Sequence, residues 1–116
     1  MEKQQTLPKG NAVEENCKST TLKRQGTLQK LSGGEHRQPK WDVRHFELDE
    51  YGYLCYFEKA GGKLKGKIYL REAEVVISKL DKLKVEIMTE ERTYVLKTNS
   101  EKDAIAWKND IANFTK

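Results

Sequence analysis

Two basic side chains, Lys30 and Arg44, stand near the loop ends of two segments in which apolar and polar residues alternate. Strand side chains alternate between the two faces of a sheet, so Leu28 and Lys30 share one face. On the second segment Arg44 shares a face with Phe46 and Leu48, and these apolar residues mark it as the inner face. Burying two unpaired cations costs several kcal/mol, so we expect both cations to stay at the rim of a half-open core and to bind an anion.

The rest of the chain predicts a mainly β fold with one C-terminal helix. Short strands separated by turns at roughly 8 to 12 residues are typical of an antiparallel sandwich or barrel. The expected strands are 24–31, 41–48, 53–58, 67–70, 73–79, 83–87 and 93–97. From Ser100 to Phe114 the apolar period becomes helical, with Ser100 as the N-cap and Trp107 on the apolar stripe. We expect this helix to cover one end of the barrel.

Length and composition fit one domain preceded by a tail. Residues 1–23 hold few apolar side chains and no periodicity, so we expect them to be disordered, with the domain at 24–116. The chain has 22 Lys and Arg against 18 Asp and Glu, a mild excess that permits an anionic partner. Nucleic acid is not expected, because the basic loops lack the interleaved aromatic residues on which bases stack.

Nothing in the sequence supports catalysis, a metal site or a cofactor. His36 and His45 show no spacing to a nucleophile or to further metal ligands. The two cysteines, Cys17 and Cys55, form neither a disulfide framework nor a zinc set, which favours a reducing compartment. No apolar run approaches the 18 or so residues that cross a bilayer. We therefore expect a monomeric, non-enzymatic, cytoplasmic protein.

Three motifs, in this order and at this spacing, resemble the pleckstrin homology (PH) domain. They are G-x-L-x-K at Gly26–Lys30, W-x-x-R-x-F-x-L at Trp41–Leu48 and the helical Trp107, and the resemblance runs from Arg24 to Phe114. It implies a barrel of seven antiparallel strands in two near-orthogonal sheets, capped by the C-terminal helix. Many members of this family bind phosphoinositide headgroups at the open end, where we expect the two basic side chains described above.

The resemblance also implies a set of binding residues. The expected headgroup site consists of Lys30, Arg44, Tyr56 and Lys65, with the Tyr56 hydroxyl donating to phosphate. Four further cations in two loops are expected to contact the acidic membrane surface around it, at about 1 kcal/mol for each Lys or Arg. These peripheral residues are Arg37, Lys40, Lys59 and Lys63.

One residue departs from the motif of members that bind 3-phosphorylated lipids. Asp42 stands two positions before Arg44, where that motif has a cation. Its carboxylate repels phosphate, so we expect modest affinity and limited selectivity. We do not expect Asp42 to pair with Arg44, and Glu35, across the loop, is the alternative partner.

Two functions follow from these features. The first is a membrane-targeting adaptor module that binds phosphoinositides or other acidic phospholipids at the membrane surface. The alternative is a protein interaction domain on the same scaffold, with a peptide in a groove formed by Val75 to Ile77, Ile105 and Ile111.

Overall fold

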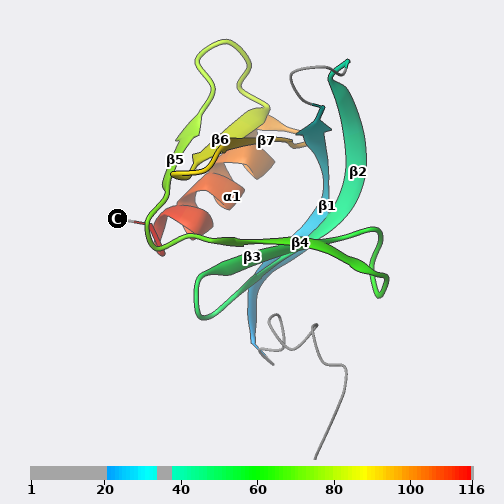
Figure 1. Ribbon diagram of the computed structural model, residues 1–116. Coiled ribbons are helices and arrows are strands. Elements are labelled where there is room, and N and C mark those ends of the chain that lie inside the picture. The colour runs from blue at the N-terminus through cyan, green and yellow to red at the C-terminus, as the bar shows by residue number, and fades with distance from the viewer. Residues whose placement is uncertain (1–20, 34–37, 116) are drawn as a thin grey trace, which may run out of the picture.

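The computed structural model of the chain describes residues 21–33 and 38–115 and shows seven strands followed by one helix (Figure 1). The predicted tail lies largely outside these residues. The elements are β1 (Leu22–Ser32), β2 (Lys40–Asp49), β3 (Tyr53–Phe57), β4 (Leu64–Tyr69), β5 (Glu74–Ile77), β6 (Lys84–Met88), β7 (Thr93–Lys97) and α1 (Glu101–Ala112). The predicted element order is confirmed.

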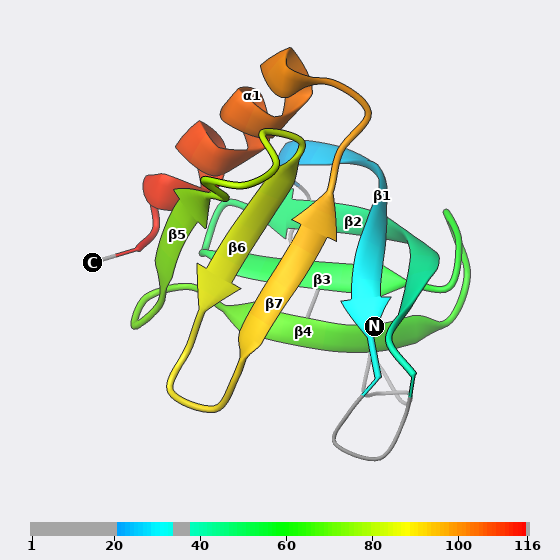
Figure 2. The ribbon, with the colours of Figure 1, turned by 90° about the horizontal axis from the view of Figure 1, so that it is seen from above.

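The seven strands form one antiparallel sheet in the order β4-β3-β2-β1-β7-β6-β5. Strand β1 is central, because it pairs with β2 along its length and also with β7 through Gln29 and Lys30. Figure 2 shows β2, β3 and β4 running across the direction of β5, β6 and β7. The sheet thus folds over on itself into the predicted barrel, and both halves share β1.

The core lies between the two halves of the sheet and is built by period-two alternation. Leu28 of β1, Phe46 and Leu48 of β2 and Leu54 of β3 are each at most 2% exposed. Strands β6 and β7 contribute buried side chains from the opposite half. Inner-face positions that follow these residues toward the loop between β1 and β2 therefore point into the open end of the barrel.

Helix α1 covers one end of the barrel, as expected. Ser100 is its N-cap, and its hydroxyl accepts a hydrogen bond of 3.1 Å from the backbone N–H three residues later. Trp107 is 2% exposed, and its ring lies against Gly26, where an added Cβ would be 3.6 Å away. An ion pair between Arg24 and Asp110 joins β1 to the outer part of the helix. The opposite end, with the turns that join β1 to β2 and β6 to β7, is not covered by the helix.

Most strand boundaries differ from the prediction by one to three residues, and β1 begins at Leu22, inside the segment expected to be a disordered tail. Strand β4 begins at Leu64 instead of residue 67, because the chain reverses tightly between β3 and β4 through Gly61, which has a φ of +74°. Lys65 consequently lies in a strand and not in a loop. Strand β5 ends at Ile77, and residues 78–83 form a loop before β6.

Cys55 is 1% exposed, as expected of a small apolar side chain, but its sulfur is disulfide-bonded. This bond differs from the expectation that the two cysteines form no disulfide framework, and Cys17 lies outside the described residues. Within 21–33 and 38–115, α1 is too short and too polar to cross a bilayer. The same residues contain no group of three or more His, Cys, Asp or Glu side chains that could hold a metal ion.

Candidate functional site

Lys30 lies on the inner face of β1 near the open end, and it is buried more deeply than the sequence predicts. The residue is only 8% exposed. Its ammonium nitrogen lies 5.1 Å from the ring centroid of Tyr56 and 6.0 Å from that of Tyr94. In the described part of the chain no carboxylate forms an ion pair with Lys30 and no acceptor receives a hydrogen bond from it. Two ring faces therefore stabilise this cation in place of an anion.

The charges around Lys30 leave an excess of positive potential. Burial is the main cause that lowers the pKa of Lys30, and the charge of Arg92 is the next. Asp42, directly opposite Lys30 in the β1–β2 ladder, raises this pKa, while Arg44 lowers it. Among the charges alone, Arg92 lowers the pKa of Lys30 more than Asp42 raises it, and Arg44 lowers it further. One carboxylate therefore does not neutralise these cations. An additional anion would be stabilised here.

Arg44 forms an ion pair with Asp42, so the prediction that these residues would not pair is wrong. A guanidinium nitrogen of Arg44 lies 3.7 Å from one oxygen of Asp42, and the ammonium of Lys40 lies 3.7 Å from the other. Positions two apart in a strand share a face, which brings Asp42 and Arg44 together. A hydrogen bond from Ser32 is the largest cause that lowers the pKa of Asp42, and the neighbouring cations lower it further. Asp42 is thus an internal counter-anion of the site. The alternative partner, Glu35, lies outside the described residues.

Arg92 and Tyr94 belong to the site and are absent from the sequence prediction. The guanidinium carbon of Arg92 lies 4.5 Å from the centroid of the Tyr94 ring. Arg92 also lines a hollow of about 240 Å³ together with Ser32, Gly33 and Pro39. Because β7 is antiparallel to β1, it begins at the end of the barrel where β1 stops. The sequence alone therefore does not place Arg92 at the site, because its position depends on the pairing of β1 with β7.

Tyr56 lies on the inner face of β3 opposite Gly66 of β4. A Cβ on Gly66 would lie 2.3 Å from the Tyr56 hydroxyl oxygen, which shows that the ring packs directly over the glycine. Burial, and secondarily Tyr94, raise the pKa of Tyr56, so the phenol is neutral and can donate a hydrogen bond. Lys65 is exposed and precedes Gly66, so strand alternation turns it toward the outer face.

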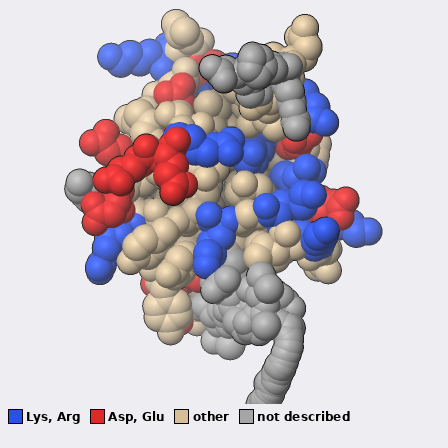
Figure 3. All heavy atoms as spheres, viewed as in Figure 1, with Lys and Arg blue, Asp and Glu red and all other residues tan. Residues whose placement is uncertain are grey.

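The predicted headgroup residues are therefore only partly brought together. Lys30, Arg44 and Tyr56 share the inner face at the open end, while Lys65 lies beside it on the edge strand β4. Of the predicted peripheral cations, Lys40 precedes Asp42 on β2, and Lys59 and Lys63 are exposed in the turn between β3 and β4. Arg37 lies outside the described residues. Figure 3 shows basic side chains gathered on the right of this face and acidic ones on the left.

A family model described as PH domain matches residues 22–116. The chain belongs to the PH domain family. PH domains are generally non-catalytic modules, many of which bind phosphoinositides or proteins. In a comparison with curated proteins, none matches this chain.

Several solved PH domains are similar to this one. The C-terminal PH domain of pleckstrin in complex with D-myo-Ins(1,2,3,4,5)P5 is 28% identical, with 83% of this chain and 100% of that chain covered and a TM-score of 0.68. Its complex with D-myo-Ins(1,2,3,5,6)P5 is 31% identical over 78% of this chain and 92% of that chain, also with a TM-score of 0.68. The solution structure of the C-terminal PH domain of human pleckstrin is 27% identical, covers 94% and 92% of the two chains, and has a TM-score of 0.69.

Proposed function

We propose that this PH domain is a non-enzymatic adaptor module that binds phosphoinositides and other acidic phospholipid headgroups with modest affinity. The observation that carries this proposal is the ammonium of Lys30, which is buried between two tyrosine rings without a carboxylate partner in the described residues. An anion at the open end would relieve this charge. The module would act at the cytoplasmic surface of membranes, as a monomer and without a cofactor.

Three inner-face residues, together with Arg92 of the exposed turn between β6 and β7, would hold the phosphate groups. Lys30, Arg44 and Arg92 supply cationic donors around one opening, and the Tyr56 hydroxyl supplies a neutral donor. A hydrogen bond to a charged group contributes about 1.5–3 kcal/mol, so two or three such contacts suffice for binding. Two inositol pentakisphosphates are bound by the similar C-terminal PH domain of pleckstrin, which supports this class of ligand.

Exposed lysines would add attraction to the membrane around this site. Lys40, Lys59 and Lys63 flank the opening from the start of β2 and from the turn between β3 and β4. Lys65, which the sequence predicts as a headgroup contact, points to the outer face of β4 and would add to this surface attraction instead. Each cation near an acidic surface contributes about 1 kcal/mol, and this contribution falls as salt rises.

Asp42 is the reason for proposing modest affinity. Its carboxylate forms ion pairs with two of the available cations, Lys40 and Arg44, at 3.7 Å each. A phosphate that reaches Arg44 must compete with this pair and is repelled by the same charge. The ligand therefore gains less from Arg44 than it would from an unpaired guanidinium.

A peptide-binding groove between β5 and α1 has less support. Val75 and Ile77 pack against the core, and Ile111 is fully buried. Three of the expected apolar contacts are thus already used within the fold. Val76 and Ile105 remain exposed, at 40% and 53%, but they do not favour a protein partner over a lipid.

The test is titration of a soluble inositol polyphosphate into the wild-type protein and the Arg44→Ala variant by calorimetry. We expect the variant to bind about tenfold more weakly or worse, because it loses at least one charge-assisted hydrogen bond. Arg71→Ala is the matched control, since Arg71 is exposed between β4 and β5, and its affinity should not change. Equal affinities for Arg44→Ala and the wild type would refute the assignment of the site.

A second measurement separates a pocket from a general charge effect. Sedimentation with vesicles containing single phosphoinositides or phosphatidylserine is performed at about 0.05 and 0.15 M salt. Binding to one phosphoinositide that persists at the higher salt supports a specific pocket. Absence of binding to every acidic vesicle would refute the proposed function.

A further inference from the structure

Strand β4 is an edge of the sheet that the helix leaves uncovered. It pairs with β3 on one side, and within residues 21–33 and 38–115 no strand pairs with its other side. The opposite edge strand, β5, lies against α1, and Figure 2 shows β4 at the border of the sheet far from the helix. Backbone N–H and C=O groups along the outer edge of β4 can therefore pair with an added strand.

A hollow of about 300 Å³ lies beside this edge. Its wall opposite β4 belongs to β7 and to residues 89–92, which we call the β6–β7 turn. The volume is at the low end of the range for ligand pockets, about 300–1,000 Å³, so the hollow suits an extended segment better than a helix about 10–12 Å across. The lining residues are Lys67, Ile68, Tyr69, Glu72, Thr89, Glu90, Glu91 and Tyr94.

Three exposed carboxylates stand at the rim of this hollow. Glu72 follows β4, and Glu90 and Glu91 belong to the β6–β7 turn. Glu90 and Glu91 form no ion pair with any residue that the structure describes. Figure 3 shows acidic side chains on the left of the view, over the β6–β7 turn and the link between β4 and β5. The rim therefore complements a cationic partner.

The three carboxylates suit several separate cations better than one metal ion. In the described part of the chain no group of three or more acidic, histidine or cysteine side chains is close enough to hold a metal ion. The carboxylates must therefore be met by cationic side chains that are themselves spread along a segment. A basic polypeptide segment provides such spacing.

The β6–β7 turn has a defined conformation before any partner binds. The hydroxyl of Thr89 donates to the carbonyl of Arg92 at 2.9 Å and accepts from the backbone N–H groups of Glu91 and Arg92, at 3.2 Å each. The backbone N–H of Thr89 donates to the same carbonyl at 2.9 Å. The acidic wall of the hollow is thus already formed, so that binding requires little ordering of the protein.

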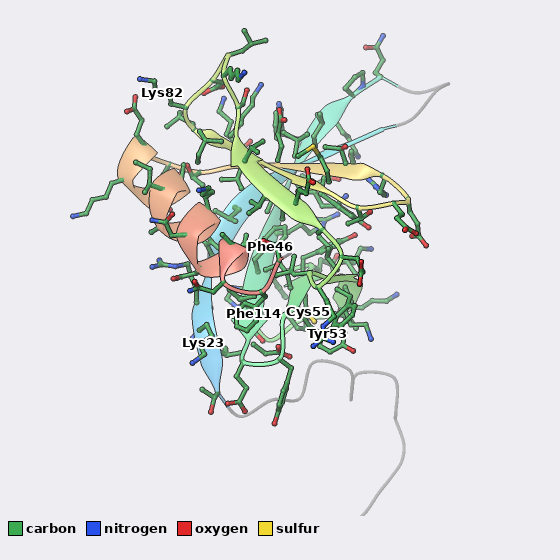
Figure 4. The ribbon with its side chains drawn as sticks, turned by 90° about the vertical axis from the view of Figure 1, so that its left-hand side faces the viewer. Lys23, Phe46, Tyr53, Cys55, Lys82 and Phe114 are labelled. Carbon is green, nitrogen blue, oxygen red and sulfur yellow. The ribbon has the colours of Figure 1, made fainter. Side chains whose placement is uncertain are left out.

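Strand alternation determines which side chains an added segment needs. Lys67 and Tyr69 point to the outer face, where the ammonium of Lys67 lies 5.0 Å from the centroid of the Tyr53 ring. Figure 4 shows Tyr53 on the side of the molecule away from α1. Ile68 points inward, toward the half of the sheet that carries the β6–β7 turn, and is 2% exposed. Alternate side chains of the added segment would face the carboxylates of this turn, and the others would lie beside Tyr69.

We infer that β4 is the docking edge for an extended segment of a partner protein in which Lys or Arg alternates with apolar residues. The segment pairs its backbone with β4, places its cations at the carboxylates of the rim, and covers Tyr69, which is 46% exposed. This contact goes beyond the proposed function, because the acidic rim repels an acidic membrane. A second copy of the chain fits less well, since two paired β4 edges bring Lys65 and Lys67 of both copies together.

The first experiment titrates a labelled peptide, Lys-Val-Lys-Val-Lys-Thr with blocked ends, into the whole protein and follows fluorescence anisotropy. We expect the double variant Glu90→Gln, Glu91→Gln to bind about three- to tenfold more weakly than the wild type, because each exposed ion pair contributes little. Both side chains are exposed in a turn, so the variant should unfold at the wild-type temperature. No binding of the peptide to the wild type would overturn the inference.

The matched control removes the same charge elsewhere. In Glu58→Gln, Glu101→Gln the two exposed carboxylates lie after β3 and at the start of α1, outside the hollow. This variant should bind the peptide as the wild type does. Equal affinities for the two double variants would show that overall charge attracts the peptide, and would overturn the inference.

Two further peptides of equal charge test the pairing with β4. Methylating every backbone nitrogen keeps the side chains and removes the N–H donors, and Lys-Lys-Lys-Val-Val-Thr keeps the composition without the alternation. We expect each to bind at least about threefold more weakly, because strand addition needs backbone hydrogen bonds and alternating side chains. Equal binding of all three peptides would overturn the inference.

Other occupants of the hollow are distinguished by two measurements on the protein without peptide. Sedimentation equilibrium should show a monomer, and a dimer that is lost in Glu90→Gln, Glu91→Gln would make a second copy the occupant and overturn the inference. Vesicles of phosphatidylcholine and phosphatidylserine should bind this variant at least as well as the wild type. Weaker vesicle binding would assign the rim to the membrane and would also overturn it.

Discussion

Replacing Lys30 by Met should weaken headgroup binding without weakening the fold. The aliphatic stem is retained and the ammonium is removed from a position that is 8% exposed. The loss of a charge-assisted hydrogen bond to phosphate, about 1.5–3 kcal/mol, corresponds to about a 10- to 150-fold weaker Kd. If Lys30 contributed only to packing, its replacement by Met would not change the affinity for the headgroup.

The effect of Lys30→Met on stability follows from two opposing contributions. The cation–π contacts with Tyr56 and Tyr94, at 5.1 and 6.0 Å, are lost at about 0.5–1 kcal/mol each. Against this, a buried group without a hydrogen-bond partner costs about 1–3 kcal/mol, more when it is charged. We expect an unchanged free energy of unfolding or a gain of up to about 1 kcal/mol, which raises Tm by about 4–8 °C in a domain of this size.

The pH dependence of stability gives an independent check on Lys30. Its folded-state pKa lies below the ordinary value of 10.5, so the native state releases this proton before the unfolded state does. At low pH Lys30 is charged in both the folded and the unfolded state, so the full free-energy cost of burying its charge is present. As pH rises through the folded pKa toward 10.5, the cost fades, so the wild type should gain stability relative to Lys30→Met.

The assays are urea unfolding at neutral pH and near pH 10, and inositol polyphosphate titration at neutral pH. Lys102→Met is the control, because Lys102 is exposed on the first turn of α1 and should change neither measurement appreciably. A loss of more than about 1 kcal/mol in Lys30→Met, with unchanged affinity, would refute the reasoning and make Lys30 a structural residue.

Three further outcomes are expected. Asp42→Lys should tighten inositol polyphosphate binding in calorimetry, because it removes the counter-anion of Arg44; unchanged affinity would place the phosphate elsewhere. Gly66→Ala should displace the Tyr56 ring, costing about 1–3 kcal/mol in urea unfolding, and should also weaken the same titration. Trp107→Ala should cost about 3–5 kcal/mol, a large part of an ordinary domain's stability, and a smaller loss in denaturant unfolding would show that the helix is not held by this side chain.

The fold could be predicted because its signals are local. Alternation in the strands, the change to a helical period after Ser100 and the position of Trp107 each specify an element without knowledge of its neighbours. The start of β4 was missed because the tight reversal at Gly61 leaves no mark on the apolar pattern. Such boundaries depend on turn geometry, which a flexible glycine pair does not determine.

The candidate site could be predicted only where one hairpin determines it. Lys30 and Arg44 lie on the inner face by alternation within β1 and β2, and the Asp42–Arg44 pair follows from the same rule applied correctly. Arg92 and Tyr94 come from the opposite half of the sheet. Their place depends on the pairing of β1 with β7, which no local pattern shows. The burial of Lys30 was missed for the same reason, because one of the two rings that cover it belongs to β7.

The pairing of β1 with β7 also bears on when the binding site comes into being. Gln29 and Lys30 pair with Lys97 and Leu96, which lie far away in the sequence, so this pairing needs nearly the whole domain to be present. Closing so long a loop is slow, and contacts of this range tend to form late in folding. The hairpin of β1 and β2 alone would hold Lys30 and Arg44 but not the rest of the site. Because the proposed site needs residues from both halves of the sheet, we expect ligand to shift the folding equilibrium toward the completed fold, and we expect a chain that stops before β7 to be unable to bind.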